Sequence, residues 1–124
     1  MIREASPIES YRDLIAWQKA MDFVGDIYTS TNIFPTSEQF GLISQLRRAA
    51  VSIPSNIAEG QGRISKGEFK QFLGNARGSL LEVETQILIS RKLGYIVEER
   101  CAGLLQRSKE LGRILNGLIN ALRR

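Results

Sequence analysis

The stretch SKGEFKQFLGNARGSLLEVETQILISRKLG, Ser65 to Gly94, decides the fold of this chain. Ser65 followed three residues later by Glu68 is typical of a capping box, in which each side chain accepts from the other residue's backbone N–H at the start of a helix. Apolar side chains then recur at the three- and four-residue spacing of one helix face: Phe69, Phe72, Ala76, Leu80, Val83 and Ile87. Gly94 suits the left-handed backbone that ends a helix. We expect one long amphipathic helix here.

Three further segments carry the same helical spacing. The first runs from Tyr11 to Thr31, with a predicted core face of Leu14, Trp17, Met21, Val24 and Tyr28. The second begins at a predicted Thr36–Gln39 capping box, and Pro54 is expected to kink it. Its predicted buried stripe is Ile43, Leu46, Ala50, Ile53 and Ile57. The last runs from Val97 to Leu122, with a seam of Leu104, Ser108, Leu111, Leu115, Leu118 and Leu122.

The connections between these segments are short, so consecutive helices must run antiparallel. The sequence therefore predicts an all-α, up-and-down antiparallel four-helix bundle over residues 11–124, preceded by a flexible segment over residues 1–10. A chain of 124 residues with 43% hydrophobic and 24% charged residues is typical of one globular domain.

Composition excludes several functions. The chain has no histidine, the commonest metal ligand and proton-transfer group, so we expect no enzyme, no cofactor and no small-molecule substrate. The single Cys101 is interpreted as a packing residue. Because no apolar run is long enough for a membrane helix or a secretory signal, we expect a cytoplasmic protein without a membrane partner.

Two helices carry more apolar surface than one bundle needs. Phe23 and Ile27 widen the face of the first helix, and Leu81 and Leu88 form a second seam on the third. These four residues either are the edges of faces buried within one molecule or form a subunit interface, and two seams favour the interface. Glycines inside the helices indicate either close helix approach or tolerated surface positions: Gly74, Gly78, Gly103, Gly112 and Gly117.

The charged residues suggest three further sites. The turn from Gly60 to Gly62 is either a plain turn or an anion site before a helix. Arg48 is expected to pair with Glu82 or Glu84, within the bundle or between subunits, rather than to contact nucleic acid freely. With a net charge of +4, an anionic partner is possible, and the candidate patch for nucleic acid, which Glu68 interrupts, is made of Arg63, Lys66, Lys70 and Arg77.

The sequence also contains blocks with a family likeness. RAAVSIPSNIAEG (Arg48 to Gly60), the run from Ser65 to Ile87 and LGY (Leu93 to Tyr95) together resemble the four-helix bundle family encoded in intervening sequences of bacterial large-subunit ribosomal RNA genes. The resemblance covers nearly the whole chain from Tyr11. It implies a ring-like homopentamer without enzymatic activity. It also implies that certain positions shape the end of the second helix rather than bind a ligand: Pro54, Asn56, Glu59 and Gly60.

Two functions remain open. Related accessory proteins of diversity-generating retroelements imply binding of nucleic acid or of a nucleic-acid enzyme. The first hypothesis is therefore a non-enzymatic oligomeric bundle that binds RNA, DNA or a ribonucleoprotein through a basic surface. The alternative is a protein-interaction scaffold or regulator, in which the basic residues serve solubility and ion pairing.

Overall fold

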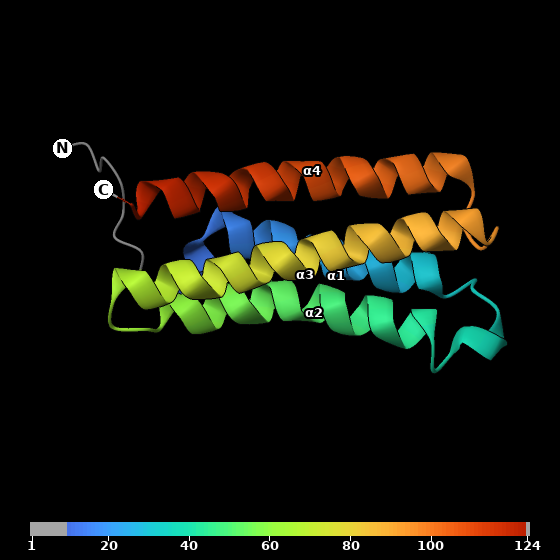
Figure 1. Cartoon of the computed structure of the whole chain (residues 1–124), viewed down its shortest axis with the longest axis horizontal. Coiled ribbons are helices and arrows are strands. Elements are labelled where there is room, and N and C mark those ends of the chain that lie inside the picture. The colour runs from blue at the N-terminus through green and yellow to red at the C-terminus, as the bar shows by residue number, and fades with distance from the viewer. Residues whose placement is uncertain (1–9, 124) are drawn as a thin grey trace.

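The computed structural model describes residues 10–123, which form four α-helices and two 3-10 helices without a strand (Figure 1). The long helices run back and forth along one axis, as predicted for an up-and-down bundle. Their bounds are α1 (Ile15–Thr31), α2 (Leu42–Gln61), α3 (Lys66–Lys92) and α4 (Glu98–Ala121), with η1 (Tyr11–Asp13) and η2 (Thr36–Glu38) preceding α1 and α2. Most of the predicted flexible segment lies outside the described residues, but Ser10 caps η1.

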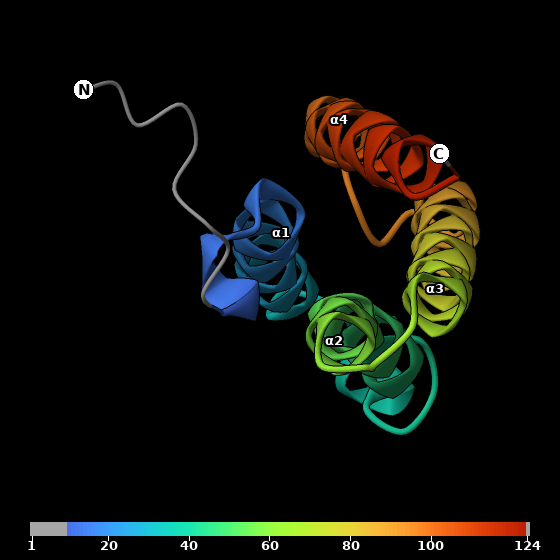
Figure 2. The same ribbon diagram turned by 90° about the vertical axis from the view of Figure 1, so that its left-hand side faces the viewer.

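The helices follow one another around the bundle in chain order (Figure 2). α2 and α3 have the most extensive contact, and α1 and α4 the least among neighbouring pairs. All four contribute to one core, whose largest fully buried side chains include Phe23, Ile27, Leu46, Ile53, Ile57, Leu73, Ile87, Leu104, Leu111 and Leu115. Cys101 is buried in the same core as a free thiol, as predicted.

The core face of α1 differs from the predicted one. Phe23 and Ile27, expected at a subunit interface, are only 2% and 1% exposed within the single chain. Met21 and Tyr28, expected in the core, are 45% and 41% exposed. The apolar surface of α1 is wide, and the small side chains of Ala16 and Ala20 share a face with Phe23 and Ile27. This face packs against α2 and α4, and Met21 and Tyr28 lie outside the core.

The start of α2 also differs from the sequence interpretation. Thr36 makes no side-chain capping bond, because Gly41 adopts a non-helical backbone (φ −109°, ψ −113°) that separates η2 from α2. Glu38 provides the cap instead, since its Oε1 accepts the backbone N–H of Leu42 at 3.0 Å. The helix therefore begins six residues later than the Thr36 signal predicts.

The middle of α2 accommodates Pro54 without ending. Proline has no N–H to donate to the carbonyl of Ala50, yet the helix continues to Gln61. Side chains on either side bond back to the helix backbone: the hydroxyl of Ser52 donates to Ala49, and the amide of Asn56 donates to the carbonyl of Ser52 at 2.8 Å. Ser52 also bonds Ser79 of α3, which ties this stretch to the neighbouring helix.

Gly60 marks a close approach of α2 to α3. A Cβ at this position would lie 2.6 Å from the Cβ of Phe72 and 3.1 Å from a ring carbon of Phe69. Close approach thus explains Gly60, and Gly112 has ordinary contact with Leu80. The other four glycines named from the sequence face open space within the described chain: Gly74, Gly78, Gly103 and Gly117.

The LGY block closes the opposite end of the bundle. Gly94 has the predicted left-handed backbone (φ +80°), which lets the backbone N–H of Tyr95 donate to Ser90 at 2.9 Å. The Tyr95 ring packs on Phe34, and its hydroxyl donates to Oε2 of Glu38 at 3.0 Å. Glu38 thereby links the α1–α2 connection to the α3–α4 connection.

We predict opposite effects of alanine at two helical glycines. Gly60→Ala forces α2 and α3 apart and should lower the free energy of unfolding by about 1–3 kcal/mol. Gly74→Ala meets no neighbouring atom and should raise it by up to about 1 kcal/mol through helix propensity. Urea unfolding of both variants checks this, and equal effects of the two substitutions would contradict the packing argument.

We also predict a late tyrosine titration. The hydrogen bond to Glu38, then burial and the carboxylate charge, raise the pKa of Tyr95 above 10.0. The folded state holds the neutral phenol, so this contribution to stability is complete below pH 10 and is lost as the pH rises through the raised pKa. Tyrosinate absorbance should show a late step that Tyr95→Phe removes and Glu38→Gln moves to lower pH. A late step that persists in Tyr95→Phe would refute the assignment.

Candidate nucleic-acid interface

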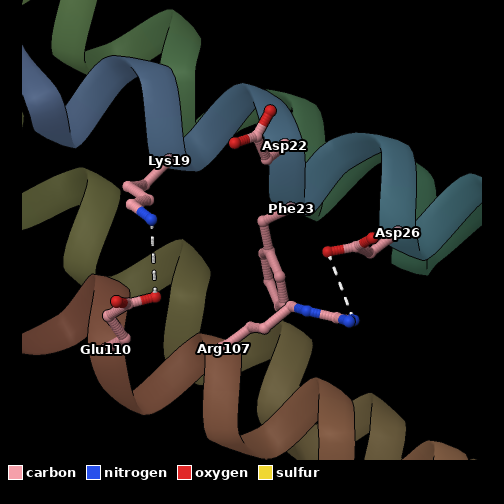
Figure 3. Close-up of a pocket in the computed structure, with 6 residues that line it drawn as sticks. All are labelled: Lys19, Asp22, Phe23, Asp26, Arg107 and Glu110. Carbon is pink, nitrogen blue, oxygen red and sulfur yellow. Dashed lines mark ion pairs between the residues drawn. The ribbon is translucent and has the colours of Figure 1, made fainter.

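A charged hollow of about 260 Å³ lies between α1 and α4 (Figure 3). Its walls pair across the seam: Lys19 lies 3.9 Å from Glu110, and Arg107 lies 3.4 Å from Asp26. Asp22 and Asp26 therefore lie beside the α1–α4 seam. Partly exposed pairs of this kind contribute about 0–1 kcal/mol each, so the hollow is a weakly stabilised seam.

An apolar groove of about 350 Å³ runs between α1 and α2. It contains much of the α1 surface that the sequence pattern assigned to the core, and its lining is Tyr11, Trp17, Met21, Val24, Val51, Pro54, Ser55 and Ala58. The rings of Tyr11 and Trp17 meet edge to face with centroids 5.2 Å apart. η1 thus forms part of one wall of the groove.

The outer face of α3 is the second exposed apolar surface. Leu81 and Leu88 are 57% and 53% exposed, so both lie outside the core of the single chain. Gly74, Gly78 and Thr85 share their face at helical spacing. This face combines large apolar side chains with a stretch of bare backbone.

The four predicted nucleic-acid contacts divide into two groups. Arg63 lies on the α2 side, where its guanidinium is 3.2 Å from Glu59 and 4.7 Å from the centre of the Phe72 ring. The other three, Lys66, Lys70 and Arg77, share the edge of α3 that borders α4. Arg77 reaches across to α4 and donates to Oδ1 of Asn116 at 2.7 Å. The structure thus brings three of the four together and gives Arg63 a packing role.

Charge is distributed unevenly along the α3–α4 pair. The first part of α3 and the last part of α4 lie at the end where α2 turns into α3, the left-hand end in Figure 1. Within residues 66–81 and 111–123 the basic side chains outnumber the acidic ones by five to one: Lys66, Lys70, Arg77, Arg113 and Arg123 against Glu68. Residues 82–110 hold five basic and five acidic side chains. Sequence reasoning missed the α4 contribution because it judged each helix separately.

Arg48 does not form the predicted pair within the bundle. It lines a shallow hollow with Glu82, yet the described residues contain no ion pair between them. Glu82 accepts from the amide of Gln86 at 3.3 Å, and Glu84 accepts the hydroxyl of Ser108 on α4. Pairing of Arg48 between subunits stays a prediction.

The neighbouring Arg47 has the structural role instead. Its guanidinium lies 4.5 Å from the centre of the Tyr28 ring. It also donates to Thr31 at 2.9 Å and to Asn32 at 3.0 Å. Arg47 thus fixes the end of α1 against α2.

The turn from Gly60 to Gly62 uses its own donors. The backbone N–H groups of Gly62 and Arg63 donate to the carbonyls of Ala58 and Gly60. At the start of α3, Ser65 accepts the N–H of Glu68 and donates its hydroxyl to the Glu68 carboxylate. An acidic group thus already lies at this helix terminus, which favours the plain-turn interpretation.

None of the helices within residues 10–123 combines the length and apolar character that a membrane crossing requires. The same residues bring no three potential metal ligands together.

Known proteins identify the family. No curated protein matches the chain. A protein of unknown function from the S23 ribosomal protein family of Bacteroides thetaiotaomicron VPI-5482 has a similar crystal structure, with a TM-score of 0.79 and 22% identity over 86% of this chain and 96% of that one. The family model described as 23S rRNA-intervening sequence protein matches residues 12–117. The predicted family resemblance is confirmed, and the chain belongs to the family of 23S rRNA-intervening sequence proteins.

Proposed function

We propose that this chain is a non-enzymatic bundle that binds RNA or DNA, alone or within a ribonucleoprotein, through the basic end of its α3–α4 pair. The single observation that supports this is the five-to-one excess of basic over acidic side chains at that end. Lysine and arginine that neutralise backbone phosphates release counterions, and this release drives sequence-independent binding.

Repetition of the chain would strengthen a modest patch. The net charge of one copy is +4, so a pentamer would carry about +20. Several weak contacts on one assembly bind a long polyanion with far higher avidity than one contact alone. The proposed compartment is the bacterial cytoplasm, which suits a chain with one free, buried thiol.

We predict a reduced salt dependence when the α3 row of Lys66, Lys70 and Arg77 is changed to glutamine. The slope of the logarithm of the binding constant against the logarithm of the salt concentration is negative. Removal of three phosphate contacts should reduce its magnitude by about 2–3. Fluorescence anisotropy with a labelled RNA over a salt series measures this slope. A matched control with the same loss of charge at the other end is Arg91, Lys92 and Arg100 changed to glutamine. Equal slopes for both triple variants would exclude the basic end as the site.

A protein-interaction scaffold is the second candidate function, and the two exposed apolar surfaces favour it. The α1–α2 groove contains the side chains of Trp17 and Met21, and the outer face of α3 presents Leu81 and Leu88. Contact between two different surfaces of the same chain is heterologous and closes a ring when the rotation fits. We propose that the outer face of α3 packs in the α1–α2 groove of the next copy, which would build the ring-like homopentamer. The scaffold function instead requires that one of these surfaces bind another protein.

We predict that Leu81→Glu combined with Leu88→Glu lowers the oligomeric state. Both side chains are already exposed in the single chain, so the fold should persist while two charges enter the contact. Light scattering coupled to size exclusion measures the molar mass. Ile64→Glu is the control, because Ile64 is fully exposed in the α2–α3 turn. An unchanged mass for the double variant would exclude this face from assembly.

A further inference from the structure

We infer that α4 supplies a second basic row, and that the α3 and α4 rows together bind the sugar–phosphate backbone of a nucleic-acid duplex. The inference rests on the proposed function and adds to it the residues of α4 and the class of nucleic acid. Its starting point is the contact between Arg77 on α3 and Asn116 on α4.

The α4 row is a polar stripe without a single apolar or acidic member. Its residues follow one another at steps of four and three, the spacing of one helix face, and all are exposed: Lys109, Arg113, Asn116, Asn120 and Arg123. It spans about 20 Å at 1.5 Å per residue. Arg113 and Arg123 form no ion pair within residues 10–123, so both guanidinium groups keep their donors for an external acceptor.

The α3 row runs alongside it in the opposite direction. Lys66, Lys70 and Arg77 occupy the edge of α3 next to α4 and span about 16 Å. Three contacts fix the register of the two helices, and they place Lys70 near the end of α4: Arg77 with Asn116, Gly112 with Leu80, and Ser108 with Glu84. The two basic rows therefore lie side by side at one end of the bundle.

Two carboxylates near the rows, those of Glu68 and Glu110, are held by other residues. Glu68 is half a helical turn from the Lys70 edge, and its carboxylate is held by Ser65. Glu110 on α4 pairs with Lys19 on the α1 side. Residues 70–81 of α3 and 111–123 of α4 contain no acidic side chain, and Glu84 lies only at the Lys109 end of the rows, where it accepts the hydroxyl of Ser108.

The spacing of the rows favours a duplex. Packed helices lie about 8–10 Å apart, so the cations form two parallel lines instead of one. Two lines can follow the two phosphate strands that border a groove, whereas a single strand needs one charged groove with aromatic platforms for its bases. Neither row contains an aromatic residue, and Phe69 and Phe72 lie on the α2 side of α3. Asn116 and Asn120 add neutral donors and acceptors suited to sugar and phosphate oxygens.

The test compares three labelled probes of one sequence: an RNA duplex of about 20 base pairs, its single strand, and the corresponding DNA duplex. Anisotropy with the full chain should show at least tenfold tighter binding of a duplex than of the single strand. Arg113→Gln with Arg123→Gln should weaken duplex binding about tenfold, and Asn116→Ala about threefold. Lys92→Gln with Arg100→Gln removes the same charge elsewhere and should change binding less than twofold. Circular dichroism confirms that each variant keeps its helices.

The outcomes distinguish failure of this inference from failure of the proposed function. If the Arg113 and Arg123 variant binds like the parent while the triple variant of the α3 row is weakened, the α4 row is refuted and the proposed function stands. Equal binding of duplex and single strand refutes the preference for a duplex. Absence of binding to every probe refutes both. Tighter binding of either duplex than of the single strand supports the inference. The duplex that binds more tightly then identifies the nucleic acid as RNA or DNA.

Discussion

The close contact of α2 with α3 at Gly60 is the constraint on which the rest of the bundle depends. No side chain fits between the α2 backbone and Phe72, so these two helices pack more extensively than any other pair. The contact also places Arg63 over Phe72 and brings Ser52 within bonding distance of Ser79. α3 is thereby turned so that its basic edge faces α4 and its leucine face remains exposed.

The sequence predicts the helices of this protein better than their relative rotation. The α3 pattern, the left-handed Gly94 and most of the α2 and α4 core positions are confirmed, because the helical period marks one clear apolar face there. α1 has an apolar surface too wide for the period to choose a face. Packing against α2 and α4 decides which side of α1 faces the core, and the small Ala16 and Ala20 lie on that side.

Some residues of the candidate site can be found from the sequence, and others cannot. Lys66, Lys70 and Arg77 are found from sequence because they recur on one helix within twelve residues. Asn116 is not, since it is neutral and lies 39 residues from the arginine that it contacts. Its membership in a polar stripe from Lys109 to Arg123 is a sequence signal, but its meaning depends on which helix packs beside that stripe.

The weak seam between α1 and α4 has a consequence for how the chain folds. The α2–α3 hairpin forms from residues close in sequence, so its loop closure costs little entropy, whereas α1 and α4 are joined only through the whole chain. Their contact is the smallest between neighbouring helices, and partly exposed ion pairs border the hollow in it. We expect the hairpin to be the folding nucleus and this seam to be the last to close and the first to open.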